Sequence, residues 1–217
     1  MSKHQSETEE LRLRFHILAT QLGVANTHLH YALRLEEARK NYDKSFLRAY
    51  DFWEYTKRAH LETATFYLCR TYDEHNCAIQ LHRFLNEIPR ASLNEVQKNI
   101  LQTDMVFCCE KSKVPAVEKL RHWRNHFAAH YNYQLTTFRG RRDLTGLKSK
   151  TSKTPSLTEL QQLIDRGFEI LERWASFYKS SPAFQKLIKD KDDYLFVLEA
   201  IEEKRIKEKT VARSSVN

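Results

Sequence analysis

Apolar side chains recur at spacings of three and four along the first 40 residues, between polar positions. This spacing places the apolar side chains on one face of an α-helix, so the pattern predicts a helix over residues 6–40. Gly23 lies inside this segment and indicates either a bend or the close approach of a neighbouring element. The apolar stripe consists of Leu11, Phe15, Leu18, Leu22, Ala25, Leu29 and Ala32.

A second segment with helical periodicity covers residues 44–72 and is rich in aromatic side chains. We interpret these aromatic side chains as part of a core rather than as a platform on which bases stack. A shorter helix is expected over residues 77–87, and Pro89 ends it because proline cannot continue a helix. The apolar positions of the second segment are Phe46, Ala49, Phe52, Trp53, Ala59, Ala64, Tyr67 and Leu68.

Local start signals mark the helices in the middle of the chain. Ser92 and Glu95 have the spacing of a capping box, in which each side chain bonds the other residue's backbone N–H. This signal predicts a helix over residues 92–109. Pro115 suits the first turn of the next helix, which is expected over residues 115–133.

The C-terminal part of the chain opens with another capping box. Ser156 and Glu159 have the same three-residue spacing, and the apolar pattern after them predicts a helix to about residue 178. Further helices are expected over residues 182–188 and from residue 192, with a charged and frayed tail over 205–217.

Residues 135–156 break the helical periodicity. Gly140, Gly146 and Pro155 fall here among Ser and Thr, which predicts a flexible loop or at most a short hairpin. Its positive charge is suited to contact phosphates without reading base sequence, although a solvated loop that keeps the chain in solution fits equally well. The basic residues are Arg139, Arg141, Arg142, Lys148, Lys150 and Lys153, with Asp143 as their acidic neighbour.

Composition agrees with an all-α fold. The 217 residues include only 4 glycines and 4 prolines. These two residue types disfavour the helix interior, so their scarcity permits long helices. No strand pair or internal repeat is evident. We therefore expect a helical bundle of five or more helices with long N-terminal helices. This length suits a single domain over residues 1–217, with two domains as the weaker alternative.

The net charge and the absence of long apolar segments indicate which partner and which compartment to expect. The formal net charge of +8 favours an anionic partner such as nucleic acid. No apolar run reaches the roughly 20 residues of a membrane helix, and the polar N-terminus lacks the core of a signal peptide. We expect a cytoplasmic protein without membrane contact. Cys69, Cys77, Cys108 and Cys109 lack metal-binding spacing and are interpreted as small buried side chains in a reducing compartment.

The strongest functional signal lies in residues 120–133, where polar and titratable side chains are interleaved with aromatic residues and alanines. Arg124 and Asn125 are followed by His130, with five residues between the arginine and the histidine. Trp123 and Phe127 can give one helical face to packing while the polar groups project from the rest of the surface. Such a concentration of hydrogen-bonding groups on a packed helix indicates a binding site.

The Arg124, Asn125 and His130 pattern resembles the signature of the HEPN superfamily, whose helical domains bind nucleotides or cleave RNA in many prokaryotic defence systems. That signature is an arginine, commonly a following polar residue, and a histidine after four to six further residues. Residues 66–73 and 81–85 also resemble the abortive-infection branch of the superfamily, and the resemblance extends loosely over residues 10–180.

The resemblance implies RNA cleavage without a metal or other cofactor. The 2′-hydroxyl attacks the adjacent phosphate, which leaves a cyclic phosphate and a free 5′-hydroxyl. In this scheme His130 performs acid–base work, because an imidazole titrates near neutral pH. Arg124 neutralises charge on the phosphate, and Asn125 orients either the phosphate or His130. Tyr131 is a candidate for stacking on a nucleotide, although packing in the core is the simpler interpretation.

The resemblance also implies a homodimer in which two copies of the motif form one composite active site. The spacing agrees with this, because Arg124 and His130 are six positions apart and diverge by about 120° on a regular helix. The small Ala128 and Ala129 would let another helix approach closely. An antitoxin partner is a further expectation.

Other interpretations of the same residues stay open at this point. His122, His126 and His130 fall one turn apart, which is a metal-chelating spacing that Asp73 could complete. Arg124 and His130 could instead have a structural role, in an ion pair or a helix cap with other groups of the bundle. The leading hypothesis is a HEPN-type endoribonuclease of a defence or toxin–antitoxin system, cleaving RNA. The rival is a non-catalytic HEPN-like module that binds a nucleotide or a protein.

Overall fold

The computed structural model describes residues 3–72, 79–109, 112–125, 154–178 and 193–214. Every regular element within these ranges is a helix, so the predicted all-α fold is confirmed. Within the same ranges no helix is both long and apolar enough to span a bilayer.

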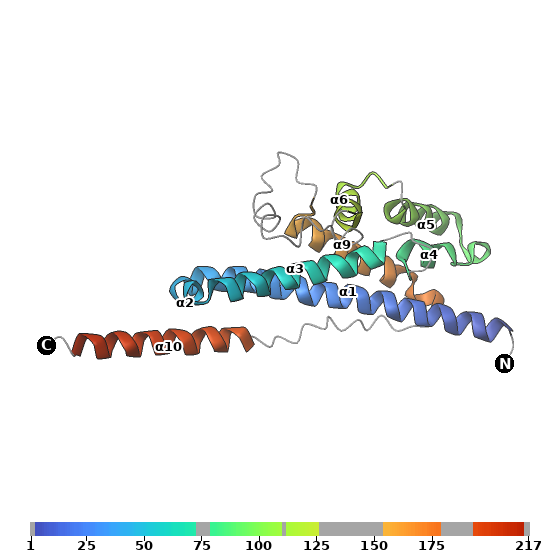
Figure 1. Ribbon diagram of the computed structural model, residues 1–217. Helices are drawn as coiled ribbons and strands as arrows, with labels where there is room; N and C mark the ends of the chain where they lie inside the picture. Colours follow the sequence, from blue (N-terminus) through green and yellow to red (C-terminus); the bar gives the residue numbers. More distant parts are fainter. Residues whose placement is uncertain (1–2, 73–78, 110–111, 126–153, 179–192, 215–217) are drawn as a thin grey trace.

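Two long antiparallel helices form the scaffold on which the rest of the chain is built. Helix α1 (Lys3–Asn41) and helix α3 (Tyr50–Tyr72) run side by side and are joined by the short α2 (Asp43–Arg48) (Figure 1). The predicted stripe of α1 is buried from Phe15 to Ala32, where the side chains are at most 2% exposed. Gly23 is buried within it, in a continuous helix.

The predicted single helix over residues 44–72 is wrong in one respect. Ala49 adopts φ −132° and ψ 40°, outside the helical region, so the segment divides into α2 and α3. The backbone N–H of Ala49 donates to the carbonyl of Phe46 and closes the end of α2. This turn lets the chain reverse and brings α3 back along α1.

The aromatic side chains of α3 do not all belong to the core, which corrects a second expectation. Trp53 and Tyr72 are buried, but Phe52 is 60% exposed, Tyr55 58% and Phe66 45%. The exposed residues recur at helical spacing on the side of α3 that its neighbouring helices leave uncovered. The spacing of apolar residues predicts that a helix has an apolar and a polar face. It does not predict how many neighbouring helices pack against that helix, and so which aromatic side chains are buried.

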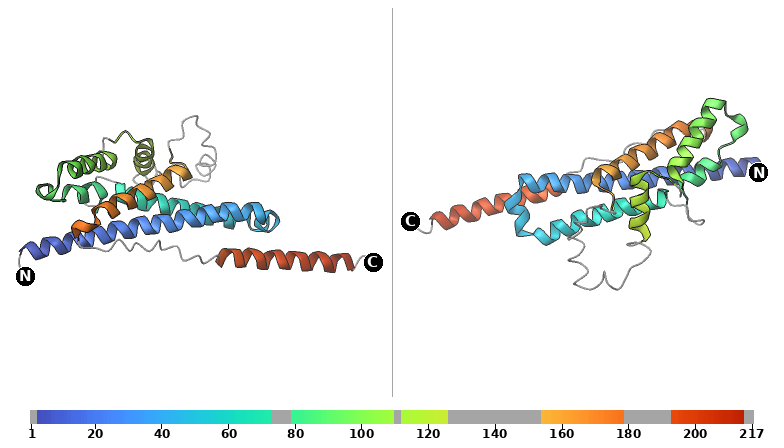
Figure 2. Two further views of the ribbon diagram at one scale, coloured as in Figure 1. Left: turned by 180° about the vertical axis from the view of Figure 1, so that it is seen from behind. Right: turned by 90° about the horizontal axis from the view of Figure 1, so that it is seen from above.

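The remaining helices lie mainly on one side of this scaffold (Figure 1). Figure 2 (right) shows α6 crossing α3, and the two helices are in contact. The elements are α4 (Leu81–Asn86), the 3₁₀ turn η1 (Arg90–Ser92), α5 (Glu95–Cys108), α6 (Pro115–Trp123), α9 (Leu157–Trp174), the 3₁₀ turn η3 (Ala175–Tyr178) and α10 (Asp193–Ser214).

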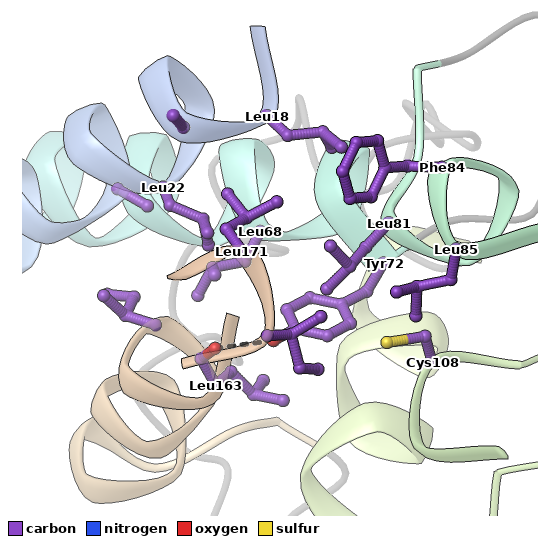
Figure 3. Packing of buried hydrophobic residues seen from close by; sticks show 14 of the residues in the cluster. Leu18, Leu22, Leu68, Tyr72, Leu81, Phe84, Leu85, Cys108, Leu163 and Leu171 are labelled. Carbon is purple, nitrogen blue, oxygen red and sulfur yellow. Dashed lines mark hydrogen bonds between the residues drawn. The ribbon is translucent and has the colours of Figure 1, made fainter. Parts of the chain in front are cut away.

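The main core forms where α1, α3, α4, α5 and α9 meet (Figure 3). Leu18 from α1, Leu68 from α3, Phe84 from α4 and Leu163 from α9 are each no more than 1% exposed. Cys108 from α5 also belongs to this cluster and is fully buried. Cys69 and Cys108 are thus buried as expected, Cys109 is half-buried, and Cys77 lies outside the described residues.

Of the two predicted capping boxes, one is confirmed. The Ser156 hydroxyl accepts from the Glu159 N–H at 3.2 Å, and the Glu159 carboxylate accepts from the Ser156 N–H at 2.8 Å. The box at Ser92 is wrong because Asn94, an equally good N-cap, takes its place and pairs with Gln97 at 2.9 and 3.0 Å.

The first residues of the other helices match the predicted ones in some cases and differ in others. Pro115 occupies the first turn of α6, as predicted. Ser92 lies instead in η1, where its hydroxyl donates to the carbonyl of Pro89 at 2.8 Å. The helix expected over residues 77–87 is described only from residue 79 and begins at Leu81. The helix expected at 182–188 lies outside the described residues.

Helix α10 docks on the turn between α1 and α3 rather than on the main core. Leu198 is fully buried in a second, smaller cluster with Leu35, Ala38, Phe46 and Trp53. Helix α10 runs to Ser214, through most of the segment that the sequence predicts to be charged and frayed. A single domain over residues 1–217 stays a prediction.

Candidate functional site

Helix α6 ends directly before the motif, which begins at Arg124, and is anchored in the main core. Val117 and Leu120 are no more than 1% exposed, and Trp123 packs against the same cluster from its edge. The Cys69 thiol of α3 lies 3.6 Å from the carbonyl oxygen of Leu120. Lys119 pairs with Glu159 of α9 at 2.7 Å, so α6 is held from two sides.

The helical path continues from α6 through residues 124 and 125, which lie in a π-type turn. The backbone N–H of Arg124 donates to the carbonyl oxygens of Leu120 and Arg121, as in the last turn of an α-helix. Arg124 itself keeps helical angles, with φ −54° and ψ −50°. Such wider turns often occur at functional sites, because they rotate the following side chains away from the regular helical direction.

Arg124 and Asn125 form a bonded pair at this turn. The Nε and Nη2 atoms of Arg124 both donate to the Asn125 Oδ1, at 2.9 and 2.8 Å. These bonds hold the plane of the guanidinium in a defined orientation. Arg124 is half-buried and Asn125 is exposed, so the pair lies at the protein surface next to the packed part of α6.

A buried carboxylate ties together the two helices that flank α6. Asp104 of α5 is fully buried and accepts hydrogen bonds from three side chains of α9. Arg166 Nη2 donates at 2.9 Å, Arg173 Nη1 at 2.7 Å and the Trp174 indole N–H at 2.9 Å. The charge is therefore compensated by two guanidinium groups, as a buried carboxylate requires.

A second polar contact ties α3 to α9 beside this carboxylate. The hydroxyl of Tyr72 donates to the carbonyl oxygen of Leu163 at 2.6 Å, shown as a dashed line in Figure 3. Burial raises the pKa of Tyr72 well above its ordinary value, so the hydroxyl stays protonated and keeps donating. At the C-terminal end of α5, Arg121 of α6 donates to the carbonyl oxygen of Cys109.

The family assignment follows from a comparison with protein-family models. The model for AbiU2, a HEPN-type domain, matches residues 8–197, which is most of the chain. The chain belongs to the AbiU2 family. No match was found among curated proteins or among solved structures. The resemblance to the abortive-infection branch of the HEPN superfamily is thereby confirmed, and this AbiU2-family chain is an abortive-infection-related HEPN module.

The structure places the predicted catalytic residues of this AbiU2-family chain only in part. Arg124 and Asn125 are brought together at the end of α6. His130 lies outside the described residues, so its distance from Arg124 stays a prediction. The predicted RNA-binding residues Tyr131, Arg139, Arg141, Arg142 and Lys148 also lie outside the described residues.

The alternative metal site can be followed for only one of its three histidines. His122 is described and half-buried on α6, while His126, His130 and Asp73 lie outside the described residues. Within the described ranges there is no group of three or more histidine, cysteine or acidic side chains that could hold a metal ion. The row at His122, His126 and His130 therefore stays an untested alternative.

Sequence reasoning missed the Asp104 cluster, although a signal for it exists. Asp104 follows Leu101 at a spacing of three and precedes Cys108 by four, so it stands on the apolar face of α5. A carboxylate on an apolar helical face predicts a buried partner. The sequence does not indicate which arginines provide it, because Arg166 and Arg173 are 62 and 69 positions away.

Proposed function

We propose that this AbiU2-family protein is a metal-independent endoribonuclease that acts in abortive-infection defence as a toxic component. The observation that carries the proposal is the Arg124–Asn125 pair, which presents an oriented guanidinium at the surface at the start of the Arg-to-His motif. A guanidinium is permanently charged, and its planar fork matches two non-bridging oxygens of a phosphate.

The proposed reaction forms one bond and breaks one. The ribose 2′-oxygen bonds to the adjacent phosphorus, and the bond from phosphorus to the 5′-oxygen breaks. The 2′-hydroxyl loses a proton to a base, and the leaving 5′-oxygen gains a proton from an acid. His130 provides the imidazole for this exchange. Arg124 stabilises the extra negative charge on the phosphorane oxygens, where preorganised donors contribute most.

Asn125 has a positioning role in this scheme. Its Oδ1 holds two donors of Arg124 before RNA arrives, so the guanidinium does not have to be ordered during the reaction. A phosphate oxygen carries more negative charge than an amide oxygen and forms stronger bonds to a guanidinium. RNA can therefore replace Asn125 Oδ1 as the acceptor.

A homodimer with a composite active site is part of the proposal. One reaction needs both a base and an acid, and the scheme assigns only His130 of each copy to proton transfer. Two copies related by a two-fold axis would supply both groups. Light scattering of the purified chain is expected to give the mass of a dimer. A monomer that cleaves RNA at the full rate would remove the composite site from the scheme.

The basic residues of the loop are proposed to hold the RNA backbone. Replacing Arg139, Arg141, Arg142 and Lys148 with glutamine should weaken RNA binding for all sequences alike. Loss of about four phosphate contacts should reduce the slope of log affinity against log salt by roughly 3 for a single strand. An unchanged slope would assign these charges to solubility alone.

The decisive experiment measures RNA cleavage by the wild type and by motif variants. Arg124→Ala and His130→Ala should each lower the cleavage rate by about 10²-fold or more, with unchanged helical content. Asn125→Ala should have a smaller effect. Lys113→Ala is the matched control because it removes one exposed positive charge near α6 without touching the motif.

The products and the metal requirement complete this test. Cut ends should carry a cyclic phosphate and a 5′-hydroxyl, and wild-type cleavage should persist in EDTA. His122→Ala should matter far less than His130→Ala. Equal losses for His122, His126 and His130 together with inhibition by EDTA would replace the proposal with the metal site. RNA or nucleotide binding without any cleavage would favour the non-catalytic HEPN module.

A further inference from the structure

Exposed side chains form a continuous stripe along α3, on the side of this helix that faces away from α1. From Phe52 to Arg70 they recur at spacings of three and four, which places them on one face about 100° wide. Phe52 is 60% exposed, Tyr55 58% and Phe66 45%. The α3 stripe consists of Asp51, Phe52, Tyr55, Ala59, Glu62, Phe66 and Arg70.

The opposite face of α3 is fixed against α1. The Nδ1 atoms of His28 on α1 and His60 on α3 lie 2.8 Å apart, and Lys57 pairs with Glu36 of α1 at 2.8 Å. Leu68 is fully buried in the main core on the same side of α3. The α3 stripe therefore belongs to a rigid helix, and a partner that docks on it does not have to order the backbone first.

The aromatic side chains of the stripe distinguish it from an ordinary solvated helix face. An outer face normally carries charged and polar residues, whereas a row of exposed apolar side chains indicates an interaction site. Tyrosine and phenylalanine are also enriched in protein interfaces. Spacings of three and four are those of the contact seam of a coiled coil. The stripe is therefore suited to pack against another helix.

The charges along the stripe favour a protein over a nucleic acid. Asp51 and Glu62 balance Arg70 and Arg58, which lies at the edge of the stripe and pairs with Glu62 at 2.7 Å. A surface on which bases stack needs a positively charged groove for the backbone, and this stripe has no excess of positive charge.

We propose that two copies of this chain associate through the α3 stripe, with the two α3 helices antiparallel about a two-fold axis. Because the helices run in opposite directions, each step forward on one copy is a step back on the other. Tyr55 of one copy lies opposite the partner's Phe66, so the aromatic rings meet in two symmetric pairs. Ala59 lies near the centre of the stripe, and its small side chain lets the helices approach closely.

The charges of the stripe complement themselves in this arrangement. Asp51 stands four positions before Tyr55 and Arg70 four positions after Phe66, so Asp51 meets the partner's Arg70. By the same count, Arg58 comes within one position of the partner's Glu62. Two-fold symmetry repeats each contact, and no like charges of the stripe stand opposite each other. This match is the reason to assign a second copy of the chain as the occupant.

The inference rests on the homodimer of the proposed function and names the surface at which it forms, but it does not depend on RNA cleavage. The stripe ends beside the motif. Arg70 follows Cys69, whose thiol lies 3.6 Å from the carbonyl oxygen of Leu120, one turn before Arg124. Figure 2 (right) shows α6 crossing α3 at this end. A partner on the stripe is therefore a neighbour of the proposed active site.

The experiment measures the mass of the full chain by sedimentation equilibrium over a range of concentrations. A stripe about 30 Å long on a helix about 10 Å wide is smaller than a standard interface of about 800 Å² per partner, so we expect a dissociation constant in the micromolar range. Phe66→Ser should raise this constant by about 30-fold or more, because a two-fold interface contains each substituted side chain twice. Val106→Ser is the matched control, since Val106 is 52% exposed on α5, outside the stripe.

A charge-reversal series tests the arrangement of the two helices. Arg58→Glu and Glu62→Arg should each weaken the dimer, because like charges then meet across the two-fold axis. The combined variant, with both changes in one chain, should restore the wild-type dissociation constant. Lys98→Glu changes the net charge by the same amount at an exposed ion pair of α5 and should leave the mass unchanged.

The outcomes separate this surface from the proposed RNA cleavage. Variants Phe66→Ser and Arg58→Glu that are folded by circular dichroism and as dimeric as the wild type would overturn the proposal. A wild type that stays monomeric at its highest soluble concentration would also overturn it. If that monomer lost affinity for a uridine oligonucleotide in Phe66→Ser, the stripe would be a base-stacking surface instead. A dimer that Phe66→Ser dissociates supports the surface even where no RNA is cleaved, and in that case the proposed function alone fails.

Discussion

Arginine–carboxylate pairs join helices at two places in the molecule, once around a buried carboxylate and once at the exposed surface. Between α5 and α9, the carboxylate of Asp104 meets Arg166 and Arg173 with no exposure to solvent. Between α2 and α10, the carboxylate of Glu208 meets Arg48 at 2.9 Å with both side chains about half exposed, at 49% and 48%. Each junction joins helices that are distant in the sequence through an arginine and a carboxylate.

The difference between the junctions lies in what happens when a partner is removed. The fully buried carboxylate of Asp104 cannot regain water, so loss of an arginine leaves an uncompensated charge in the core. An exposed pair exchanges its partner for water at little cost, and is worth about 0–1 kcal/mol. The first junction therefore belongs to the cooperative core, and we expect the second to open separately from the rest of the molecule.

The largest expected effect comes from breaking the buried junction. Asp104→Ala removes the acceptor of Arg166, Arg173 and the buried Trp174 indole N–H, and should lower the free energy of unfolding by about 1–3 kcal/mol. Urea unfolding measures the change. Asp104→Asn keeps an acceptor for the indole N–H and should lose less. A loss below about 1 kcal/mol would show that the carboxylate is not buried as the structure has it.

A smaller loss is expected at Gly167 of α9, where the same core is tightly packed. A Cβ at this position would lie 2.8 Å from both methyl carbons of Leu22 and 3.1 Å from the Tyr72 hydroxyl oxygen. Overpacking typically costs about 1–3 kcal/mol. Alanine gains only about 1 kcal/mol over glycine in helix propensity. Gly167→Ala should therefore lower stability in urea.

A matched control for this substitution lies on the same helix. Gln162 is exposed on α9, so Gln162→Ala should change the free energy of unfolding by no more than about 0.5 kcal/mol. If Gly167→Ala instead stabilised the chain, Leu22 would have room to move away, and the core at this point would be looser than the structure indicates.

Local opening of the exposed junction is the next prediction. Leu198 is the fully buried side chain that α10 contributes to the second cluster. Leu198→Ala should increase hydrogen exchange in α10 strongly while leaving the protection of α1 and α3 nearly unchanged. Exchange followed by mass spectrometry measures both. Equal loss of protection in all three helices would show that α10 belongs to the same cooperative unit as the core.

The smallest effect concerns the acid stability of α10. Hydrogen bonds from Arg205 and then from Ser45 lower the pKa of Glu202 from 4.5 to about 2. A lowered folded-state pKa means that the docked state gains stability above pH 4.5 and loses it as pH falls toward 2. Arg205 belongs to α10 itself, so only the bond from Ser45 of α2 couples this pKa to docking, and docking of α10 should weaken slightly over this range. Hydrogen exchange of α10 against pH tests this, and the dependence should be reduced in Glu202→Gln.

Much of the helical organisation could be predicted from the sequence alone. Periodicity located α1 and its buried stripe, and local chemistry located the starts of α6 at Pro115 and of α9 at Ser156. The motif that begins at Arg124 indicated the HEPN superfamily. These features depend on neighbouring positions in the chain, where helix geometry fixes which side chains share a face.

Other features depended on contacts between distant segments. The break at Ala49, the exposure of Phe66 and the partners of Asp104 are set by which helices pack together. The contrast is sharpest for the histidines. The sequence indicated a row at His122 by its spacing, whereas the close pair at His28 and His60 has no local signal. A helical repeat records that a face is buried, but only the packing of α1 against α3 brings those two imidazoles within hydrogen-bonding distance.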